Sequence, residues 1–284
     1  MKHLGLGTVT AVALALGAIG SAQAADMAVK APIVSVYNWT GWYLGANIGG
    51  GWGNRSVDYS ANDPASAALF APGVASGAPP SASFNSSGVL GGVQLGYNWQ
   101  VNPKWVVGVE TDFNGSGIKG SGTTNPLLLA PLFAATAAEN VRWFGTVRGR
   151  LGYLPTERLL AYVTGGFAYG RVEHTASYIN NSVIPFGIVG GAFSFTCNVT
   201  ATCFTGASSS INTGWTAGTG FEYALLNNLT LKAEYMYVSM GGNSVTETAL
   251  VVNVNAPGST LSSFNAGFGR TNFNVVRTGL NYRF

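Results

Sequence analysis

Eight segments of the chain alternate between apolar residues and small or polar residues. They are residues 42–52, 88–99, 105–114, 141–153, 160–170, 213–223, 229–238 and 274–284. In the first segment Trp42, Leu44 and Ile48 share one face, and Asn47 lies on the other face among glycines. Because successive side chains of a strand point to opposite faces, each segment is predicted to be a β-strand between two different environments.

The charged residues of these segments share the polar face. They are Glu110, Asp112, Arg142, Arg148, Arg150, Glu222, Lys232, Glu234, Arg277 and Arg283. A soluble β-sandwich carries its charges on the outward face and its apolar residues inside. Since only 9% of the chain is charged, we expect the apolar face to meet lipid rather than water.

Aromatic residues mark both ends of the predicted strands, as in the two girdles of membrane β-barrels. One belt comprises Trp42, Trp99, Trp105, Tyr153, Tyr223, Tyr282 and Phe284, and the other Trp52, Phe113, Trp143, Tyr169, Trp215 and Tyr237. Ten steps of about 3.3 Å, tilted by about 40°, span roughly 25 Å. This height matches the lipid-facing band of an outer-membrane barrel.

The predicted connections alternate in length. Residues 100–104, 154–159 and 224–228 form short turns, whereas residues 53–87, 115–140, 171–212 and 239–273 form long loops rich in Gly, Ser, Ala, Asn and Pro. Short periplasmic turns and long outer loops are typical of membrane barrels, and an even strand number places both termini on the periplasmic side. The sequence therefore predicts an all-β fold, an eight-stranded antiparallel transmembrane β-barrel over residues 41–284.

The first 24 residues are predicted to be a secretory signal peptide. Lys2 and His3 precede an apolar run, and Ala22-Gln23-Ala24 provides a cleavage site. A membrane-anchor helix is the alternative, which the glycines and the polar Thr8 and Thr10 of this run disfavour. Residues 25–40 then form a periplasmic lead. No later stretch reaches the roughly 20 apolar residues that a spanning helix needs.

Composition narrows the chemistry further. A net charge of +3 is too small for a nucleic-acid partner. In an oxidising compartment Cys197 and Cys203 are expected to form a local disulfide, because a metal pair would lack further ligands nearby. An enzyme would have to use His174, and nothing in the sequence locates a nucleophile or an oxyanion site for it. We therefore expect no catalytic, cofactor-binding or metal-binding residues.

The inward charges are expected to neutralise one another, because the side chains of an eight-stranded barrel fill its interior. We predict the pairs Glu110–Arg148, Glu222–Lys232 and Glu234–Arg277, with Asp112 and Arg150 joining the first pair and Arg142 in the same network. The alternative is a narrow hydrated channel whose arginines favour anions.

Two predicted loop segments, residues 65–80 and 126–138, are unusually apolar. They either pack on each other over the mouth of the barrel or form an adhesive surface, since exposed apolar patches tend to mark contact sites. The sequence leaves the path of the second segment open.

Several motifs together resemble the small eight-stranded outer-membrane proteins of alphaproteobacteria, a porin-like or surface-antigen family with an OmpA-type barrel. They are Trp39-Thr40-Gly41-Trp42-Tyr43-Leu44-Gly45, Gly91-Gly92-Val93-Gln94-Leu95-Gly96-Tyr97-Asn98, Val147-Arg148-Gly149-Arg150-Leu151-Gly152-Tyr153 and Leu160-Ala161-Tyr162-Val163-Thr164-Gly165-Gly166. The C-terminal Phe284, with Tyr282 and Leu280 at alternate positions, resembles the signal that the outer-membrane assembly machinery reads.

This resemblance implies location in the outer membrane, contact with its lipid and with the assembly machinery, and no catalytic residues. A surface ligand could bind at the loops. The function predicted from the sequence is structural and surface-exposed in the cell envelope. A small, weakly selective porin is the alternative, and a soluble lipocalin-type barrel, with its apolar face turned inward, comes third.

Overall fold

The computed structural model describes residues 37–63, 66–67, 81–124, 133–180, 186–190, 193–197, 201–249 and 263–284. The predicted signal peptide and most of the predicted lead lie outside these residues. Within the described ranges, no helix has the length and apolarity required to cross a bilayer.

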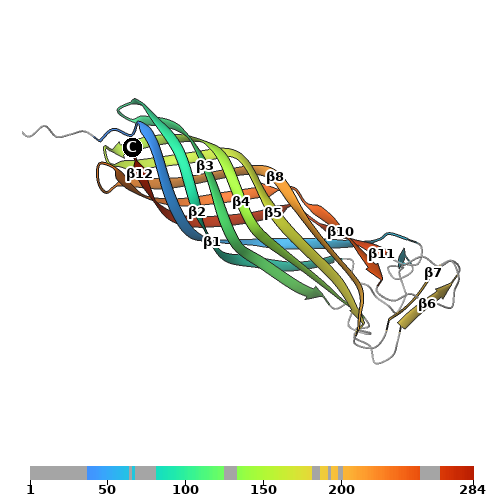
Figure 1. Cartoon of the computed structure of the whole chain (residues 1–284). Helices are drawn as coiled ribbons and strands as arrows, with labels where there is room; N and C mark the ends of the chain where they lie inside the picture. Colours follow the sequence, from blue (N-terminus) through green and yellow to red (C-terminus); the bar gives the residue numbers. More distant parts are fainter. Residues whose placement is uncertain are drawn as a thin grey trace, which may run out of the picture. The chain divides into compact units, whose positions relative to one another are not determined.

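Almost all of the described chain is β-strand (Figure 1). The strands are β1 (Gly41–Ala61), β2 (Ser81–Asn102), β3 (Trp105–Thr124), β4 (Phe133–Thr156), β5 (Leu159–Asn180), β6 (Phe186–Gly190), β7 (Phe193–Cys197), β8 (Thr202–Ala224), β9 (Leu229–Met240), β10 (Asn243–Ala249), β11 (Ser263–Phe268) and β12 (Thr271–Arg283). All pairings are antiparallel. Strands β6 and β7 form a separate two-stranded sheet.

The remaining strands close into a ring. Neighbours follow the order β1-β2-β3-β4-β5-β8-β9-β12, and β12 pairs back onto β1. Strand β10 continues β9 after a break at Gly241-Gly242, and β11 precedes β12 across a break at Gly269-Arg270. The described residues thus form a closed barrel with eight strand positions, since β10 extends β9 and β11 extends β12. This confirms the predicted fold class.

The two ends of the barrel differ in their connections. Two-residue links at residues 103–104 and 157–158 and a four-residue link at 225–228 join strands at the end where β12 finishes, which we name the turn end. The opposite end, where β1, β3 and β5 finish, is named the loop end. Each segment predicted to be a strand falls within an observed strand, apart from the final Phe284.

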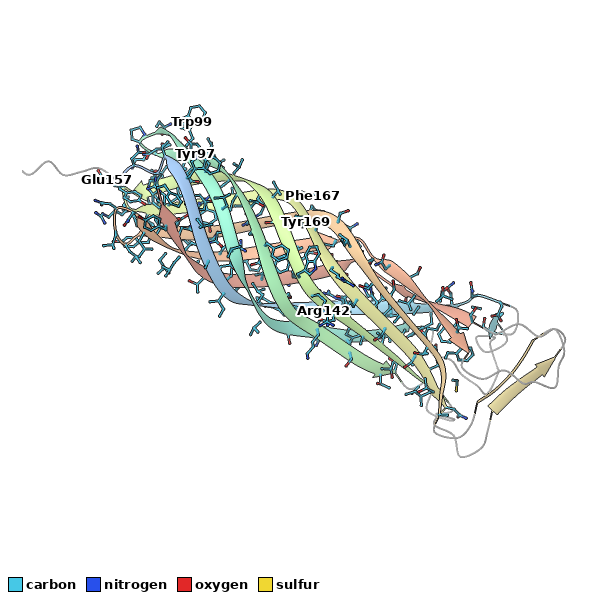
Figure 2. All side chains as sticks on the ribbon, in the orientation of Figure 1. Tyr97, Trp99, Arg142, Glu157, Phe167 and Tyr169 are labelled. Atoms are coloured by element: carbon cyan, nitrogen blue, oxygen red, sulfur yellow. The ribbon has the colours of Figure 1, made fainter. Side chains whose placement is uncertain are left out.

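The lower part of the barrel, next to the turn end, presents apolar side chains outward. Trp42, Ile48, Val89 and Trp99 are 55–76% exposed on this surface, and Phe167 is 50% exposed. Figure 2 shows Tyr97 and Trp99 near the turn end, Phe167 and Tyr169 farther along, and Arg142 closer to the loop end. The two predicted aromatic belts therefore lie on the outer surface, and together they cover only part of the length of the strands.

The strands extend well beyond the second aromatic belt, and there their pattern is inverted. In β1, Val57 and Tyr59 point inward and are buried, whereas Ser56, Asp58 and Ser60 point outward and are exposed. This pattern suits a barrel wall that faces water outside and an apolar core inside. The prediction that loops begin at residues 53, 115, 171 and 239 was therefore wrong, because the strands continue past these positions and carry their apolar residues on the inner face there.

A β-bulge at Arg142 shifts the register of β4. Val141 pairs with Val172 and Trp143 with Arg171, so Arg142 has no partner in the ladder. On the loop-end side of the bulge the inward positions therefore change from even to odd numbers, and Ala135 and Ala137 are buried inside. Residues 133–138, predicted to be loop, belong to this strand, whereas residues 126–132 and most of residues 65–80 lie outside the described part.

Three apolar clusters fill the interior at different levels. The turn-end cluster contains Trp39, Leu154 and Leu160, the middle cluster contains Phe144 and Phe273, and the loop-end cluster is centred on residues such as Val57, Phe204 and Phe264. The lead enters the turn end: Trp39 is fully buried, and its indole Nε1 donates to the carbonyl of Glu157 at 3.0 Å. The end of the lead thus packs into the barrel.

Candidate functional site

Between the turn-end and middle apolar clusters lies a group of buried charges, which we name the membrane-level network. Its members come from β3, β4, β9 and β12, and each is at most 3% exposed. They are Glu110, Asp112, Arg148, Lys232, Glu234 and Arg277. With three carboxylates and three cations, the formal charges of this network cancel.

Arg148 is the centre of the membrane-level network. Its guanidinium contacts Glu110 at 2.5 Å, Asp112 at 3.0 Å and Glu234 at 2.7 Å. Arg277 also binds Asp112 at 3.0 Å and Glu234 at 2.6 Å. Multiple charge-assisted hydrogen bonds of this kind are the condition under which buried charges are tolerated.

A second ionic group lies nearer the turn end. Arg150 forms an ion pair with Glu222, whose other oxygen accepts hydrogen bonds from Thr230 at 2.5 Å and Asn281 at 2.8 Å. The guanidinium also stacks over the ring of Tyr162, 3.8 Å from its centroid. This group therefore holds Arg150 in a fixed position.

The structure corrects two of the predicted pairings. Glu222 pairs with Arg150 rather than with Lys232, although Glu222 and Lys232 are direct register partners. Lys232 instead reaches Glu110, at 2.8 Å. Arg150 belongs to the Glu222 group rather than to the Glu110 cluster. In a closed barrel, long side chains can meet partners across the lumen as well as beside them, so adjacency of strands alone does not select the pair.

Glycines make room for the aromatic residues of this region. A Cβ atom on Gly96 would lie 2.2 Å from the hydroxyl oxygen of Tyr43, and one on Gly220 would lie 2.6 Å from that of Tyr162. Tyr43 uses the space to donate a hydrogen bond of 2.7 Å to Glu110. These two glycines permit close packing of interior side chains against the barrel wall.

The prediction that Arg142 belongs to the lumen network was wrong. Its side chain is 57% exposed on the outer surface and binds Glu173 at 2.7 Å. The β-bulge is the physical reason, because the extra residue turns Arg142 outward while Arg148 and Arg150 on the same strand point inward. The other predicted network residues all lie in the interior.

A second set of buried polar residues, the loop-level cluster, lies between the middle and loop-end apolar clusters. Glu139 binds Arg55 and accepts a hydrogen bond of 3.2 Å from Thr271, and His174 Nε2 lies 3.2 Å from the same carboxylate. Burial raises the pKa of Glu139, but the hydrogen bond with His174 and the charge of Arg55 outweigh this and hold it below its ordinary value.

Sequence reasoning missed this cluster and placed His174 in the predicted loop of residues 171–212. His174 is fully buried, and its ring lies 4.4 Å from that of Phe268. For His174 the usable signal was the alternation of β5, which continues past the second aromatic belt with even-numbered residues facing inward. For Glu139 the sequence carried no such signal, because the bulge at Arg142 changes the inward positions of β4 from even to odd numbers and is recognised only from the pairing of the strands.

Glu247 of β10 also faces the interior near the loop end. It is fully buried, and neither carboxylate oxygen has a hydrogen-bond partner among the described residues. Burial raises the pKa of Glu247 to about 9. The side chain is therefore a neutral acid at pH 7, which avoids the cost of an isolated buried charge.

Other predicted residues lie as follows. Cys203 is disulfide-bonded, while the side chain of Cys197 lies outside the described residues, so their pairing stays a prediction. Leu280, Tyr282 and Phe284 are 47%, 50% and 77% exposed on the outer surface of the last strand. No group of three or more His, Cys, Asp or Glu side chains suited to a metal ion occurs in the described part of the chain.

Comparison with known proteins gives a consistent assignment. Residues 11–284 match the family described as outer membrane protein beta-barrel domain. The 31 kDa outer-membrane immunogenic protein of Brucella melitensis is 36% identical over 275 residues, covering 93% of this chain and 94% of that protein. The 22 kDa outer membrane protein of Rhizobium leguminosarum is 27% identical over 212 residues, covering 74% and 68% respectively.

Among solved structures, the outer membrane protein OprG from Pseudomonas aeruginosa is similar with a TM-score of 0.42 and 12% identity, covering 88% of this chain and all of that one. The family match spans nearly the whole chain, and the Brucella relative aligns over nearly its full length. The chain belongs to the outer membrane protein beta-barrel domain family and is located in the outer membrane.

Proposed function

We propose that this protein is a non-enzymatic barrel with a closed lumen, whose role in the cell envelope is structural and surface-exposed. The observation that carries the proposal is the alternation of apolar and ionic layers along the interior. On β4 the inward side chains run from the turn end as Leu154, Arg150, Arg148, Phe144, Val141, Glu139, Ala137 and Ala135. Three apolar layers thus lie across the path that an ion would take.

The ionic layers support the same conclusion. The cations of the membrane-level network are bound to carboxylates at 2.5–3.0 Å, so they are not free to attract a passing anion. A conducting pore needs binding that is weak enough for ions to leave. These groups instead stabilise the interior of the barrel.

Surface presentation is supported by the relatives. The Brucella protein is named as immunogenic, and this chain aligns with almost all of it. In barrels of this class the long connections face the medium, which supports an orientation with the loop end outside and the turn end in the periplasm. His174, the residue on which an enzyme would depend, is buried between Glu139 and Phe268 rather than open to a substrate.

Conductance of the purified protein in a planar lipid bilayer tests the closed lumen. We expect no discrete openings from protein whose folding is verified by its heat-dependent migration in gels. The variant Phe144→Ala/Phe273→Ala, which thins the middle apolar layer, provides a matched comparison. Discrete openings of the wild type that change in Arg148→Ala would contradict the proposal and identify a small porin instead.

We further propose that the exposed apolar side chains of Leu280, Tyr282 and Phe284 are the part of the chain that the assembly machinery recognises. In Phe284→Ala we expect less folded barrel in the outer membrane of cells and unchanged denaturant unfolding of the refolded protein, because this side chain is 77% exposed. Leu226→Ala, in an exposed turn, is the control. Equal cellular amounts of wild type and Phe284→Ala would exclude the role.

A further inference from the structure

Exposed basic side chains gather on the outer surface of β3, β4 and β5. They are Lys119, Arg142 and Arg171. Strand register makes them neighbours: Lys119 pairs with Asn140, which pairs with Glu173, and Arg171 pairs with Trp143. We name these three residues the basic surface cluster.

The basic surface cluster borders the aromatic belt on the loop-end side. Trp143 lies 5.3 Å from Phe113 and 6.1 Å from Tyr169, measured between ring centroids, and these rings face outward. Figure 2 shows Phe167 and Tyr169 of β5 on the side of Arg142 toward the turn end. Since aromatic belts mark the membrane–water interface, the basic side chains lie at the head-group level of the outer leaflet.

The cluster carries an excess of positive charge. Glu173 is the carboxylate within it, and it binds Arg142 at 2.7 Å and lies 4.0 Å from Arg171. Arg171 also donates to the hydroxyl of Ser209 at 3.0 Å. Three cations and one carboxylate leave a formal charge of +2, with more than half of each arginine side chain exposed.

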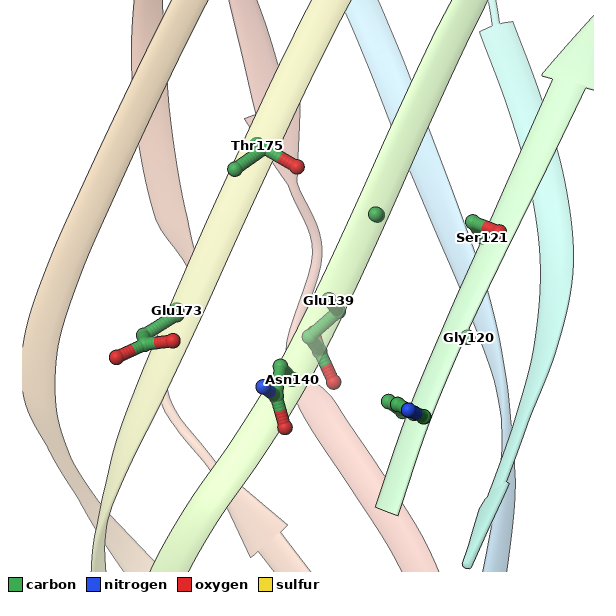
Figure 3. Close-up of a pocket in the computed structure, with 8 residues that line it drawn as sticks. Gly120, Ser121, Glu139, Asn140, Glu173 and Thr175 are labelled. Carbon is green, nitrogen blue, oxygen red and sulfur yellow. The ribbon is translucent and has the colours of Figure 1, made fainter. Parts of the chain in front are cut away.

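A hollow lies beside these charged side chains. It has a volume of about 590 Å³ and is lined by Lys119, Ser121, Asn140, Glu173 and Thr175, with Gly120 and the strand of Ala138 and Glu139 between them. Figure 3 shows its lining on three neighbouring strands. This volume is within the range of small-molecule binding sites.

The position of Arg142 on this surface depends on the β-bulge. Without the extra residue, regular alternation would turn Arg142 into the lumen, on the same side as Arg148. Bulges commonly re-aim a side chain in this way. Here the bulge adds a guanidinium to the outer surface and removes a charge from the apolar middle layer.

We propose that Lys119, Arg142 and Arg171 bind the phosphate-bearing head group of an outer-leaflet lipid. Arginine guanidinium groups match phosphate oxygens in geometry and charge. Basic side chains beside a membrane attract anionic head groups, while the neighbouring aromatic side chains contact the apolar part of the lipid. The site goes beyond the structural role proposed above and does not depend on whether the lumen conducts.

Native mass spectrometry of the detergent-solubilised barrel, titrated with diphosphoryl lipid A, tests the site. We expect binding by the wild type and at least about tenfold weaker binding by Lys119→Gln/Arg142→Gln/Arg171→Gln. Glu173→Gln releases the two arginines from their carboxylate, so it should bind several-fold more tightly. The control Lys104→Gln/Arg158→Gln removes two exposed cations at the turn end and should bind as the wild type does.

Three results would overturn the proposal. They are equal affinity of the wild type and the triple variant, equal affinity for lipid A from which both phosphates have been removed, and loss of binding in the turn-end control as large as in the triple variant. Inorganic phosphate is titrated in parallel. If it competes fully at millimolar concentration through the same three residues, the site belongs to a free anion and the lipid assignment is wrong.

Discussion

The membrane-level network and the loop-level cluster are both buried ionic groups inside one barrel, yet they are completed to different degrees. In the membrane-level network every carboxylate has at least one cation within 3.0 Å. At the loop level, Glu139 is held by Arg55 and His174, but neither carboxylate oxygen of Glu247 has a hydrogen-bond partner among the described residues. Nitrogen atoms without such a partner occur in both groups, Arg148 Nε in the first and Arg55 Nη2 in the second, so the difference lies in the carboxylates.

This difference follows the surroundings of the two regions. At membrane level the outer wall is apolar, so the polar residues of each strand point inward and can meet in one place. Beyond the second aromatic belt the outer wall is polar and the interior is mainly apolar, so an inward charge there has fewer partners. The carboxylates of the membrane-level network are thus matched by cations, whereas Glu247 has no matching cation among the described residues.

The largest expected effect comes from breaking the membrane-level network. Arg148→Ala leaves Glu110, Asp112 and Glu234 with too few cations, and we expect a loss of about 3–5 kcal/mol in the free energy of unfolding. Denaturant unfolding in lipid vesicles measures it. Arg142→Ala, on the same strand with an exposed ion pair, is the control and should cost about 0–1 kcal/mol. Equal losses of unfolding free energy in both variants would contradict the distinction between the buried network and the exposed ion pair.

The next effect concerns Glu247 and pH. The unfolded carboxyl loses its proton near its ordinary pKa of 4.5, whereas the folded one keeps it up to a pKa of about 9. Between these values the folded state binds more protons, so the free energy of unfolding should fall as pH rises, by at most about 1.4 kcal/mol per pH unit. Unfolding curves from pH 6 to pH 8 measure this slope.

Glu247→Gln removes the titrating group and keeps its shape, so this variant should lose most of that slope. Glu139→Gln is the matched control, because the pKa of Glu139 is lowered and its carboxylate is already ionised throughout the same range. The control should be less stable than the wild type but keep the slope. An unchanged slope in Glu247→Gln would show that another group causes the dependence.

A further effect is expected from Gly96→Val, which tests whether the side chains around the membrane-level network are closely packed. The added side chain collides with Tyr43, the donor to Glu110, and should cost about 1–3 kcal/mol. Gly50→Val is the control, because a Cβ there meets nothing nearer than 3.7 Å. If both variants unfold at the same denaturant concentration, the interior near Tyr43 is looser than the contacts indicate.

The sequence predicted most of the membrane-level architecture. Alternation marked the eight strands, and the charged residues on their polar faces, apart from Arg142 at the bulge, do lie inside. It also paired Glu110 with Arg148 and Glu234 with Arg277, which lie 2.5 Å and 2.6 Å apart. It did not predict the part of the barrel between the second aromatic belt and the loop end. There Val57 and Tyr59 are buried and Asp58 is exposed, so the apolar residues lie on the inner face instead of the outer one.

By itself, the sequence determined which face of each lower strand meets lipid, because alternation and side-chain polarity are local properties of the chain. The tertiary structure alone decided which charges meet across the lumen, why Arg142 points outward, and why Glu247 is buried with no hydrogen-bond partner among the residues that the structure describes. Those outcomes depend on strand register and on the closure of the ring, which bring together side chains as distant along the chain as Arg277 and Asp112. No local pattern encodes such distances.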